Sequence, residues 1–315
     1  MPTPPAARAI VVTGPPGAVD AALAATLEAV LAPLAPNARR WLSHGEALEF
    51  IVEKAGEGST RELAARLAAA LGPHPVDVNV VPAGPGRRKR LLVADMDSTI
   101  IEQECIDEMA AAFGLGTRIA AITERAMRGE LDFEAALEQR VGLLAGLSEA
   151  TLADIATERI TLTPGARVLV ATMRGGGAET ALVSGGFTFF TERIGRRAGF
   201  ARNEANRLEI VDGRLTGRVL PPILGRAAKR SALARFAVQH RIGLEETLAV
   251  GDGANDRDMV EAAGLGVAFR AKPVLQRVAA ASITHGDLTA LLYLQGFCRE
   301  EFVASSGVPA TDVWP

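Results

Sequence analysis

Apolar and polar positions follow two different rhythms along this chain, and the change between them comes near residue 85. In the first part, short strand-like segments enclose two segments whose apolar residues recur at helical spacing. We expect strands at residues 9–13, 39–42, 47–52 and 76–81, and helices at residues 19–34 and 59–71. Ser59 or Thr60 would cap the second helix. The order predicts a βαββαβ unit, the split ferredoxin-like arrangement.

From residue 91 onward, apolar strand-like runs alternate with helical segments, which is typical of a parallel sheet covered on both faces. We expect strands at residues 91–95, 181–184, 248–251, 264–269 and 282–284, and a β-hairpin at residues 208–220. Residues 102–160 show helical patterns and no convincing strand, which predicts a helical cap inserted after the first strand. The predicted fold class is α/β: a Rossmann-like parallel-sheet core with a helical cap, plus an N-terminal ferredoxin-like domain.

The segment PAGPGRRKR at residues 82–90 marks the boundary, because its Pro and Gly residues are typical of a linker. We divide the chain into an N-terminal domain at 1–85, a linker at 86–90, an α/β domain at 91–295 that contains the cap, and a C-terminal tail at 296–315. The four basic residues that end the segment are interpreted as solvated, since the run is short and lacks interleaved aromatic residues.

Composition narrows the class of protein further. The 315 residues are 48% hydrophobic and 23% charged, enough to form buried cores, and the net charge of −3 gives no global reason to expect nucleic-acid binding. No apolar stretch reaches the roughly 18–20 residues of a membrane helix, and no secretory signal is evident at the N-terminus. Two cysteines, Cys105 and Cys298, are too few for a disulfide framework. We therefore expect a cytoplasmic protein with no nucleic-acid or membrane partner.

Two aspartates, Asp95 and Asp97, end the first predicted strand of the α/β domain. The carboxyl ends of parallel strands border the ligand crevice in such sheets, and strand periodicity would place both side chains on the same face. Two close carboxylates repel each other unless a cation or a shared proton relieves the charge, and a divalent metal suits oxygen ligands. The alternative is an ordinary surface turn with an aspartate cap.

Three further groups lie near the ends of later strands or between them. Ser184 is followed by Gly185 and Gly186, whose small size lets backbone N–H groups approach an anion. Asp252, Asn255 and Asp256 follow another strand and offer the hard oxygen ligands that Mg²⁺ prefers. Lys229 lies between these two groups and would supply a cation for a phosphate. Taken singly, a Ser-Gly-Gly loop and one helical lysine are more often structural.

As a set, these motifs resemble the haloacid dehalogenase superfamily of phosphatases, and within it the phosphoserine phosphatase family. The resemblance covers about residues 91–290. The supporting segments are DMDSTIIEQECIDEMA (95–110), RAMRGELDFEAALEQRVGLL (125–144), ALVSGGF (181–187), EANRLEIVDGRLTG (204–217) and VGDGANDRDMV (250–260). The N-terminal βαββαβ unit resembles an ACT-type regulatory domain, although no motif in it is decisive.

The resemblance implies a role for each catalytic position. Asp95 would attack phosphorus and become an aspartyl-phosphate, and Asp97 would act as general acid and then as general base. Mg²⁺ would be held by Asp95, the backbone carbonyl of Asp97 and Asp252. Phosphate would be bound by Ser184, Gly185 and Lys229, while Asn255 and Asp256 would position the metal shell and the lysine.

The same resemblance places substrate specificity in the cap. Glu104 would contact the ammonium group of the substrate and Arg140 its α-carboxylate, a complementary pair for an amino-acid zwitterion. Met127 and Phe133 would close over the pocket. Without the resemblance, Glu104 and Arg140 are ordinary solvated helix charges, and Met127 and Phe133 are ordinary packing residues.

The implied activity is Mg²⁺-dependent hydrolysis of O-phospho-L-serine to L-serine and phosphate, the last step of serine biosynthesis. Three alternatives stay open at this stage: a phosphotransferase that passes the phosphoryl group to homoserine or another alcohol, a hydrolase of a different small phosphomonoester, and an amino-acid-binding regulatory module with vestigial catalysis. The role of the N-terminal domain is also open among serine binding, homodimer formation and support of the core.

Overall fold

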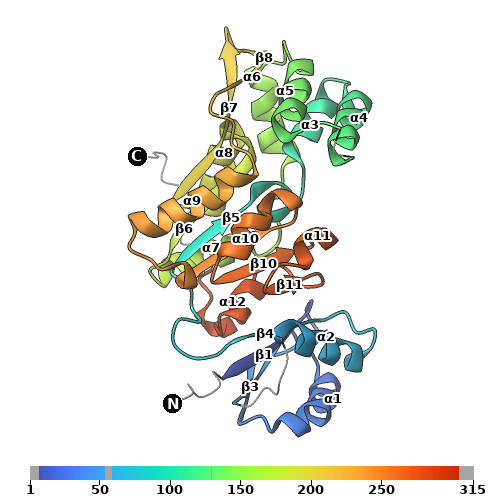
Figure 1. The fold of residues 1–315 in the computed structure, drawn as a ribbon, viewed down its shortest axis with the longest axis vertical. Coiled ribbons are helices and arrows are strands. Elements are labelled where there is room, and N and C mark those ends of the chain that lie inside the picture. Colours follow the sequence, from blue (N-terminus) through green and yellow to red (C-terminus); the bar gives the residue numbers. More distant parts are fainter. Residues whose placement is uncertain (1–6, 54–58, 129, 305–315) are drawn as a thin grey trace.

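The computed structural model describes residues 7–53, 59–128 and 130–304, which form two β-sheets with their helices and a separate helical cap. Figure 1 shows the N-terminal sheet at one end of the molecule, the larger sheet in the middle and the cap at the opposite end. The smaller sheet has the strand order β2-β3-β1-β4 and the larger one β11-β10-β9-β5-β6-β7-β8. The predicted α/β fold class is confirmed.

The N-terminal unit has the predicted order of strands and helices. Its elements are β1 (Arg8–Thr13), α1 (Ala21–Leu31), β2 (Ala38–Ser43), β3 (Ala47–Val52), α2 (Thr60–Leu71) and β4 (Asp77–Pro82), and the strands pair antiparallel. Asp20 caps α1 by accepting a hydrogen bond from the Leu23 N–H. Ser59 caps α2 in a reciprocal capping box with Glu62, so the first of the two candidate caps is the one used.

Both faces of the N-terminal sheet are buried, because β-strand side chains alternate between them. Ile10 and Val12 of β1 pack with α1 and α2 in one apolar cluster. Ala9 and Val11 belong instead to the main core of the chain, which includes all of α12 (Ala290–Leu294). The N-terminal sheet is therefore packed against the rest of the protein and not only against its own helices.

Polar side chains of β4 close the edge of the larger sheet at β11 (Ala281–Ile283). The buried carboxylate of Asp77 accepts hydrogen bonds from the backbone N–H groups of Thr284, His285 and Gly286 at 2.9, 3.0 and 3.1 Å. The amide of Asn79 exchanges two hydrogen bonds with the backbone of Ser282, at 3.0 and 2.8 Å. These side chains satisfy backbone groups that an edge strand would otherwise leave unpaired.

The larger sheet is parallel except for the β7–β8 hairpin. Its strands are β5 (Leu91–Ala94), β6 (Glu179–Phe187), β7 (Arg202–Val211), β8 (Arg214–Leu220), β9 (Thr247–Gly251), β10 (Leu265–Phe269) and β11. Its flanking helices are α7 (Ala166–Gly175), α8 (Thr188–Ala198), α9 (Arg226–Gln239), α10 (Arg257–Ala262) and α11 (Pro273–Gln276). Alternate residues of β5 enter two different apolar clusters, as expected of a sheet covered on both faces.

The cap follows β5 and is helical throughout the residues that the structure describes. It contains α3 (Cys105–Ala112), α4 (Gly116–Met127), α5 (Phe133–Leu143) and α6 (Glu149–Asp154), followed by a π-helical turn at Ile155–Arg159. The β7–β8 hairpin reaches up to the cap, where Gly146 and Leu215 form a backbone hydrogen bond of 2.8 Å (Figure 1). Within the described ranges, no helix is both long and apolar enough to cross a membrane.

Two strands are longer than the sequence pattern predicts. β6 continues through Gly185 and Gly186 to Phe187, and β7 begins at Arg202, six residues before the expected hairpin. The first residues of β7 are polar, so they show no apolar alternation that would predict a strand. They are held there by parallel pairing with β6, which is a tertiary interaction.

We expect Asp77→Ala to lower the free energy of unfolding by about 3 kcal/mol, because three backbone N–H groups, of which that of Gly286 is in a buried bond and the other two are in part-buried bonds, would lose their acceptor. Urea denaturation followed by circular dichroism measures this change. Asp20→Ala, which removes one helix cap, is the matched control and should cost about 1 kcal/mol. An Asp77 variant as stable as the Asp20 variant would show that the β4–β11 contact is not important for stability.

Candidate active site

The carboxyl ends of β5, β6 and β9 open into a cavity of about 410 Å³ beneath the cap, within the size range of small-molecule sites. Both the parallel sheet and the cap contribute to its walls. The predicted site residues that line it are Asp95, Asp97, Glu104, Phe133, Arg140, Ser184, Gly185, Asp252 and Asn255. Segments that are far apart in the sequence thus meet at one edge of the sheet.

Asp95 and Asp97 both line the cavity, but strand periodicity is not the reason. β5 ends at Ala94, and residues 96–100 coil into a tight turn in which Ser98 has a positive φ of 53°. Asp95 is 3% exposed, and its Oδ1 accepts a hydrogen bond of 2.8 Å from the Met96 N–H. The expectation that both carboxylates enter the site holds. Asp95 (φ −69°, ψ 157°) and Asp97 (φ −65°, ψ 137°) each have extended backbone angles, but they follow strand β5 and are not part of it.

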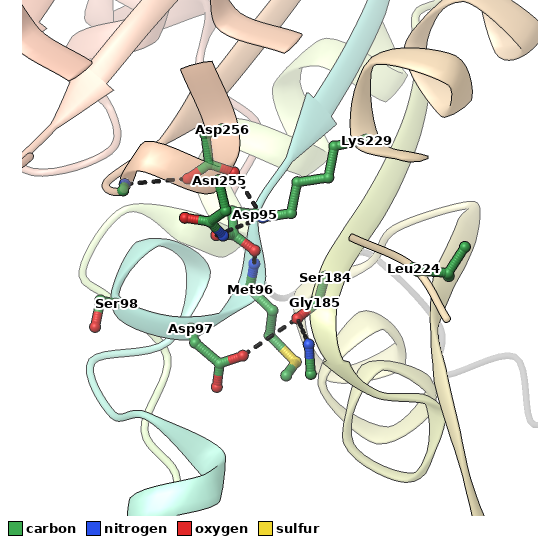
Figure 2. A network of polar contacts seen from close by, with 12 residues as sticks. Asp95, Met96, Asp97, Ser98, Ser184, Gly185, Leu224, Lys229, Asn255 and Asp256 are labelled. Atoms are coloured by element: carbon green, nitrogen blue, oxygen red, sulfur yellow. Dashed lines mark hydrogen bonds and ion pairs between the residues drawn. The ribbon is translucent and has the colours of Figure 1, made fainter. Parts of the chain in front are cut away.

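A buried ammonium group lies between two buried carboxylates at the base of the site (Figure 2). Lys229 Nζ is 2.7 Å from Asp95 Oδ2 and 2.6 Å from Asp256 Oδ1. Burial alone would lower the pKa of Lys229, but the charges of Asp256 and Asp95 and their hydrogen bonds outweigh it and raise that pKa above its usual range. The lysine is therefore a permanent cation. The N-terminal part of α9 brings it to this position.

The carboxylates still outnumber this cation. Side-chain oxygens of Asp95, Asp252 and Asp256 lie within 4.8 Å of one another. Burial, and next the charge of Asp256, raises the pKa of Asp95 well above its usual range and that of Asp252 to about 6. Three acidic oxygens gathered at one point fit a hard divalent cation, which would relieve their repulsion.

The side chains in this acidic cluster differ from the metal ligands that we expected. The cluster includes Asp256, while Asp97 was expected to contribute its backbone carbonyl. Both oxygens of Asp256 already accept hydrogen bonds, one from Lys229 and one of 3.1 Å from the Gly253 N–H. A Cβ at Gly251 would lie 2.4 Å or less from two atoms of this carboxyl group, so only glycine fits at that position. Both carboxylate oxygens of Asp256 are thus held by hydrogen bonds from the protein.

The Ser184 loop meets Asp97 from the next strand. The Gly186 N–H donates to Ser184 Oγ at 2.8 Å, and Ser184 Oγ donates to Asp97 Oδ2 at 3.2 Å. The other oxygen of Asp97 accepts a 2.8 Å bond from the Cys105 N–H at the start of α3. Burial raises the pKa of Asp97 although these hydrogen bonds oppose the shift. A Cβ on Gly186 would come within 2.9 Å of Asp97 Oδ2, so this glycine permits the close approach.

Glu104 and Arg140 enter the same cavity from the cap. Ser98 Oγ donates a 2.7 Å hydrogen bond to Glu104 Oε1. Much of the Glu104 residue is exposed, but its carboxylate faces the cavity, where partial burial and the charge of Asp97 raise its pKa to about 7. Arg140 is half-buried and donates to neutral groups, the Ala136 carbonyl at 3.2 Å and the Thr123 hydroxyl at 3.5 Å. These two hydrogen bonds therefore do not neutralise the positive charge of the Arg140 guanidinium.

Phe133 places its ring at the contact between cap and sheet. A Cβ added to Gly185 would be 3.3 Å from the ring, and one added to Gly225 would be 3.4 Å from it. The ring thus lies directly against the backbone of these two glycines. Met127 is the last residue of α4, and its side chain lies outside the described part of the structure. Asn255 points its amide toward Asp95 Oδ2, at 3.5 Å.

Several groups at the site were missed in the sequence. Ser98 and the Cys105 N–H bind acidic side chains of the site, and Thr123 and Lys272 line the cavity. Lys272 is one of four lysines in the chain, and this rarity was a usable signal. A backbone donor such as that of Cys105 leaves no signal in the sequence, because every residue except proline has one.

The chain is similar in sequence to known proteins of one family. A family model described as haloacid dehalogenase-like hydrolase matches residues 92–261, more than half of the chain. A phosphoserine phosphatase of Streptomyces coelicolor is 48% identical over 260 residues, which cover 82% of this chain and 62% of that protein. The phosphoserine phosphatase SerB2 of Mycobacterium tuberculosis is 49% identical over 231 residues, covering 73% and 56%. The chain thus spans less than two thirds of the length of these two relatives.

Solved structures show the same likeness, now over most of both chains. A HAD family hydrolase from Salmonella enterica serovar Typhi superimposes with a TM-score of 0.81 at 30% identity, covering 91% of this chain and 98% of that one. A probable phosphoserine phosphatase from Vibrio cholerae gives a TM-score of 0.74 at 32% identity, with coverages of 93% and 88%. A substrate-bound phosphoserine phosphatase gives 0.61 at 40% identity, with coverages of 65% and 98%. The chain therefore belongs to the haloacid dehalogenase-like hydrolase family.

Proposed function

We propose that this chain is a phosphoserine phosphatase, which hydrolyses O-phospho-L-serine to L-serine and phosphate. The observation that carries the proposal is one cavity lined at its base by Asp95, which pairs with the buried Lys229 behind it, and on its cap side by both Glu104 and Arg140. The base suits a phosphate monoester and the cap suits an amino-acid zwitterion. Relatives of 44–49% identity that are named phosphoserine phosphatases support the same substrate.

In the first half of the reaction, a carboxylate oxygen of Asp95 attacks phosphorus and the bond from phosphorus to the serine oxygen breaks. Asp97 gives its proton to the departing oxygen, so that L-serine leaves as the neutral alcohol. The raised pKa of Asp97 favours the protonated acid that this step needs. Lys229 holds Asp95 in place and offsets the charge of the transferring phosphoryl group.

In the second half, the aspartyl-phosphate is hydrolysed. Asp97, now ionised, takes a proton from a water molecule, whose oxygen attacks phosphorus and releases phosphate and the Asp95 carboxylate. The same residue thus serves as acid and then as base. Ser184, whose hydroxyl donates to Asp97, and the Gly185 backbone would bind the phosphate oxygens.

The acidic cluster fits a divalent cation, for which we propose Mg²⁺. Asp95, Asp252 and the backbone carbonyl of Asp97 would hold it, with Asn255 nearby and Asp256 fixing the adjacent lysine. When bound, Mg²⁺ would neutralise negative charge on the phosphate and the carboxylates.

Specificity for phosphoserine is proposed to come from the cap. The Glu104 carboxylate would bind the substrate ammonium, and the Arg140 guanidinium its α-carboxylate. Phe133, and with it Met127, would cover the bound substrate and exclude bulk water.

The remaining assignments concern the surroundings of the reaction. For the N-terminal unit we propose support of the core, because its sheet packs on α12 and its Asp77 binds the segment after β11. Serine binding and homodimer formation stay predictions, as do the ACT-type relationship and the residue boundaries of the domains. We propose a cytoplasmic location, since Cys105 and Cys298 are both free thiols.

Asp95→Asn should abolish phosphate release from O-phospho-L-serine, a loss of roughly 10⁴-fold or more, because the amide cannot form the covalent intermediate. Phosphate release is measured with Mg²⁺ and with EDTA, with and without homoserine as an acceptor. The wild-type protein should turn over with Mg²⁺ only and release equal amounts of serine and phosphate. Phosphohomoserine among the products would instead identify a phosphotransferase, and wild-type inactivity on every phosphomonoester would refute the proposed function.

Arg140→Ala should lower kcat/KM for phosphoserine by about 100-fold, close to 3 kcal/mol, because a charged bond to the substrate carboxylate is lost. Phosphoethanolamine lacks this carboxylate, so its kcat/KM should change by less than about threefold. Arg128→Ala is the matched control, since Arg128 pairs with Glu124 and Glu130 on the exposed side of the cap. Equal losses with both substrates would contradict the role given to Arg140.

Mg²⁺ should raise the melting temperature more at pH 7.5 than at pH 5.5. The folded-state pKa of Asp252, about 6, lies above its unfolded value, so the folded protein takes up protons that compete with the metal below pH 6. Without metal, this carboxylate makes stability fall as the pH rises toward 6. Mg²⁺ at about 100 times its Kd would add about 2.7 kcal/mol. Differential scanning fluorimetry measures the shift, and Asp252→Asn should remove it; a shift equal at both pH values would argue against this site.

A further inference from the structure

Asn206 of β7 is a buried amide that touches neither the cavity nor any of the predicted site side chains. Its residue is 1% exposed. Its Nδ2 donates to the Gly185 carbonyl at 2.8 Å and to the Leu224 carbonyl at 3.3 Å, and its Oδ1 accepts from the Leu224 N–H at 2.6 Å. One side chain therefore joins two backbone segments.

Both of these segments carry parts of the proposed phosphate site. Gly185 follows Ser184 near the carboxyl end of β6, and Leu224 precedes the N-cap of α9, the helix that carries Lys229. Figure 2 shows Leu224 and the Ser184–Gly185 segment on the same side of the site. The Asn206 amide lies between them and fixes their separation.

The need for this amide follows from the sheet register. Val183 pairs with Glu204, but the next pair is Phe187 with Asn206, so β6 has two more residues than β7 over this interval. The extra residues form a bulge that frees the backbone at positions 184–186 from regular pairing. The Gly185 carbonyl is thereby left without a ladder partner, and the Asn206 side chain supplies one.

A single peptide group connects the hydrogen bond of Asn206 to the hydrogen bonds of Ser184 and Asp97. In a trans peptide the C=O of Gly185 and the N–H of Gly186 point in opposite directions. Asn206 binds the carbonyl side, and the N–H side donates to Ser184 Oγ at 2.8 Å. Since Ser184 Oγ accepts there, its own hydrogen is free for Asp97 Oδ2, 3.2 Å away. Successive hydrogen bonds of this kind polarise one another.

We propose that Asn206 is a positioning residue for phosphoryl transfer, which holds the Gly185–Gly186 peptide, and through it the Ser184 hydroxyl, in the orientation that binds phosphate beside Asp97. This inference rests on the proposed phosphatase function. Because the phosphate group is common to all substrates, the loss caused by removing Asn206 does not depend on the amino-acid part of the substrate.

The test compares the wild-type protein with Asn206→Ala, Asn206→Asp and the control Asn203→Ala. Asn203 lies on the same strand and accepts a 2.7 Å bond from Thr191 of α8, away from the cavity. We expect Asn206→Ala to lower kcat/KM about 10- to 100-fold, by equal factors for phosphoserine and phosphoethanolamine, and to weaken inhibition by inorganic phosphate about 10-fold. Asn203→Ala should change each quantity by less than about threefold, although its melting temperature also falls.

The Asn206→Asp variant distinguishes a positioning role of Asn206 from a purely structural role in folding. The substituted carboxyl group can donate to Gly185 only when it is protonated, so the activity of this variant relative to wild type should rise as the pH is lowered, while that of Asn206→Ala stays constant. A purely structural role predicts no such rescue. The inference is overturned if Asn206→Ala stays within threefold of wild type, or if Asn203→Ala loses as much.

The two proposals fail in distinguishable ways. A wild-type protein without phosphoserine hydrolysis refutes the proposed function. In that case, binding of inorganic phosphate to the Mg²⁺-loaded wild type and to Asn206→Ala, measured by calorimetry, still tests the positioning role. Equal affinities would overturn it, and an affinity about 10-fold weaker in the variant would support it.

Discussion

The burial of several carboxylates around one ammonium group is the constraint on which the rest of the site depends. Lys229 binds both Asp95 and Asp256 within 2.7 Å, in a place where none of the three residues is more than 3% exposed. Removing any one partner would leave an unpaired buried charge, which is far more costly than the pair itself. The supporting features follow from this need: a glycine at position 251 that leaves room for Asp256, and a helix α9 whose buried face carries the lysine. Negative charge is still in excess, and the grouped carboxylate oxygens fit a divalent cation.

The two ends of the molecule act on this centre differently. The cap contributes groups that are only partly buried, and its Glu104 and Arg140 face the cavity without pairing with the core carboxylates. Such groups keep their charge free for a ligand. None of the residues that the structure describes in the N-terminal unit lines the cavity. Its contribution is structural, through a shared apolar core and through the buried Asp77 that binds three backbone N–H groups beyond β11. β11 is two strands from β9, which ends at the acidic cluster.

Much of this architecture was predictable because it rests on local patterns. The apolar runs at residues 91–95 and 248–251 predicted buried parallel strands, and helical spacing predicted a cap without strands. The first half of β7 was not predictable, since its polar residues are held in the sheet by pairing with β6. Likewise, the end of the strand at Ala94 and the left-handed turn at Ser98 were not predicted, because this turn is held by contacts with residues outside it, among them the bond from the Cys105 N–H to Asp97.

The sequence by itself determined the class of fold and the kinds of chemical groups at the strand ends, because apolar periodicity and residue type are local properties. The tertiary structure alone decided which of these groups meet. It paired Lys229 with two carboxylates that lie well over 20 residues away in the chain, and it placed Asn206 against the Gly185 carbonyl where the sheet register breaks. Such pairings depend on three-dimensional distance and on how many backbone groups the sheet leaves unpaired, and neither quantity is encoded at a single position of the chain.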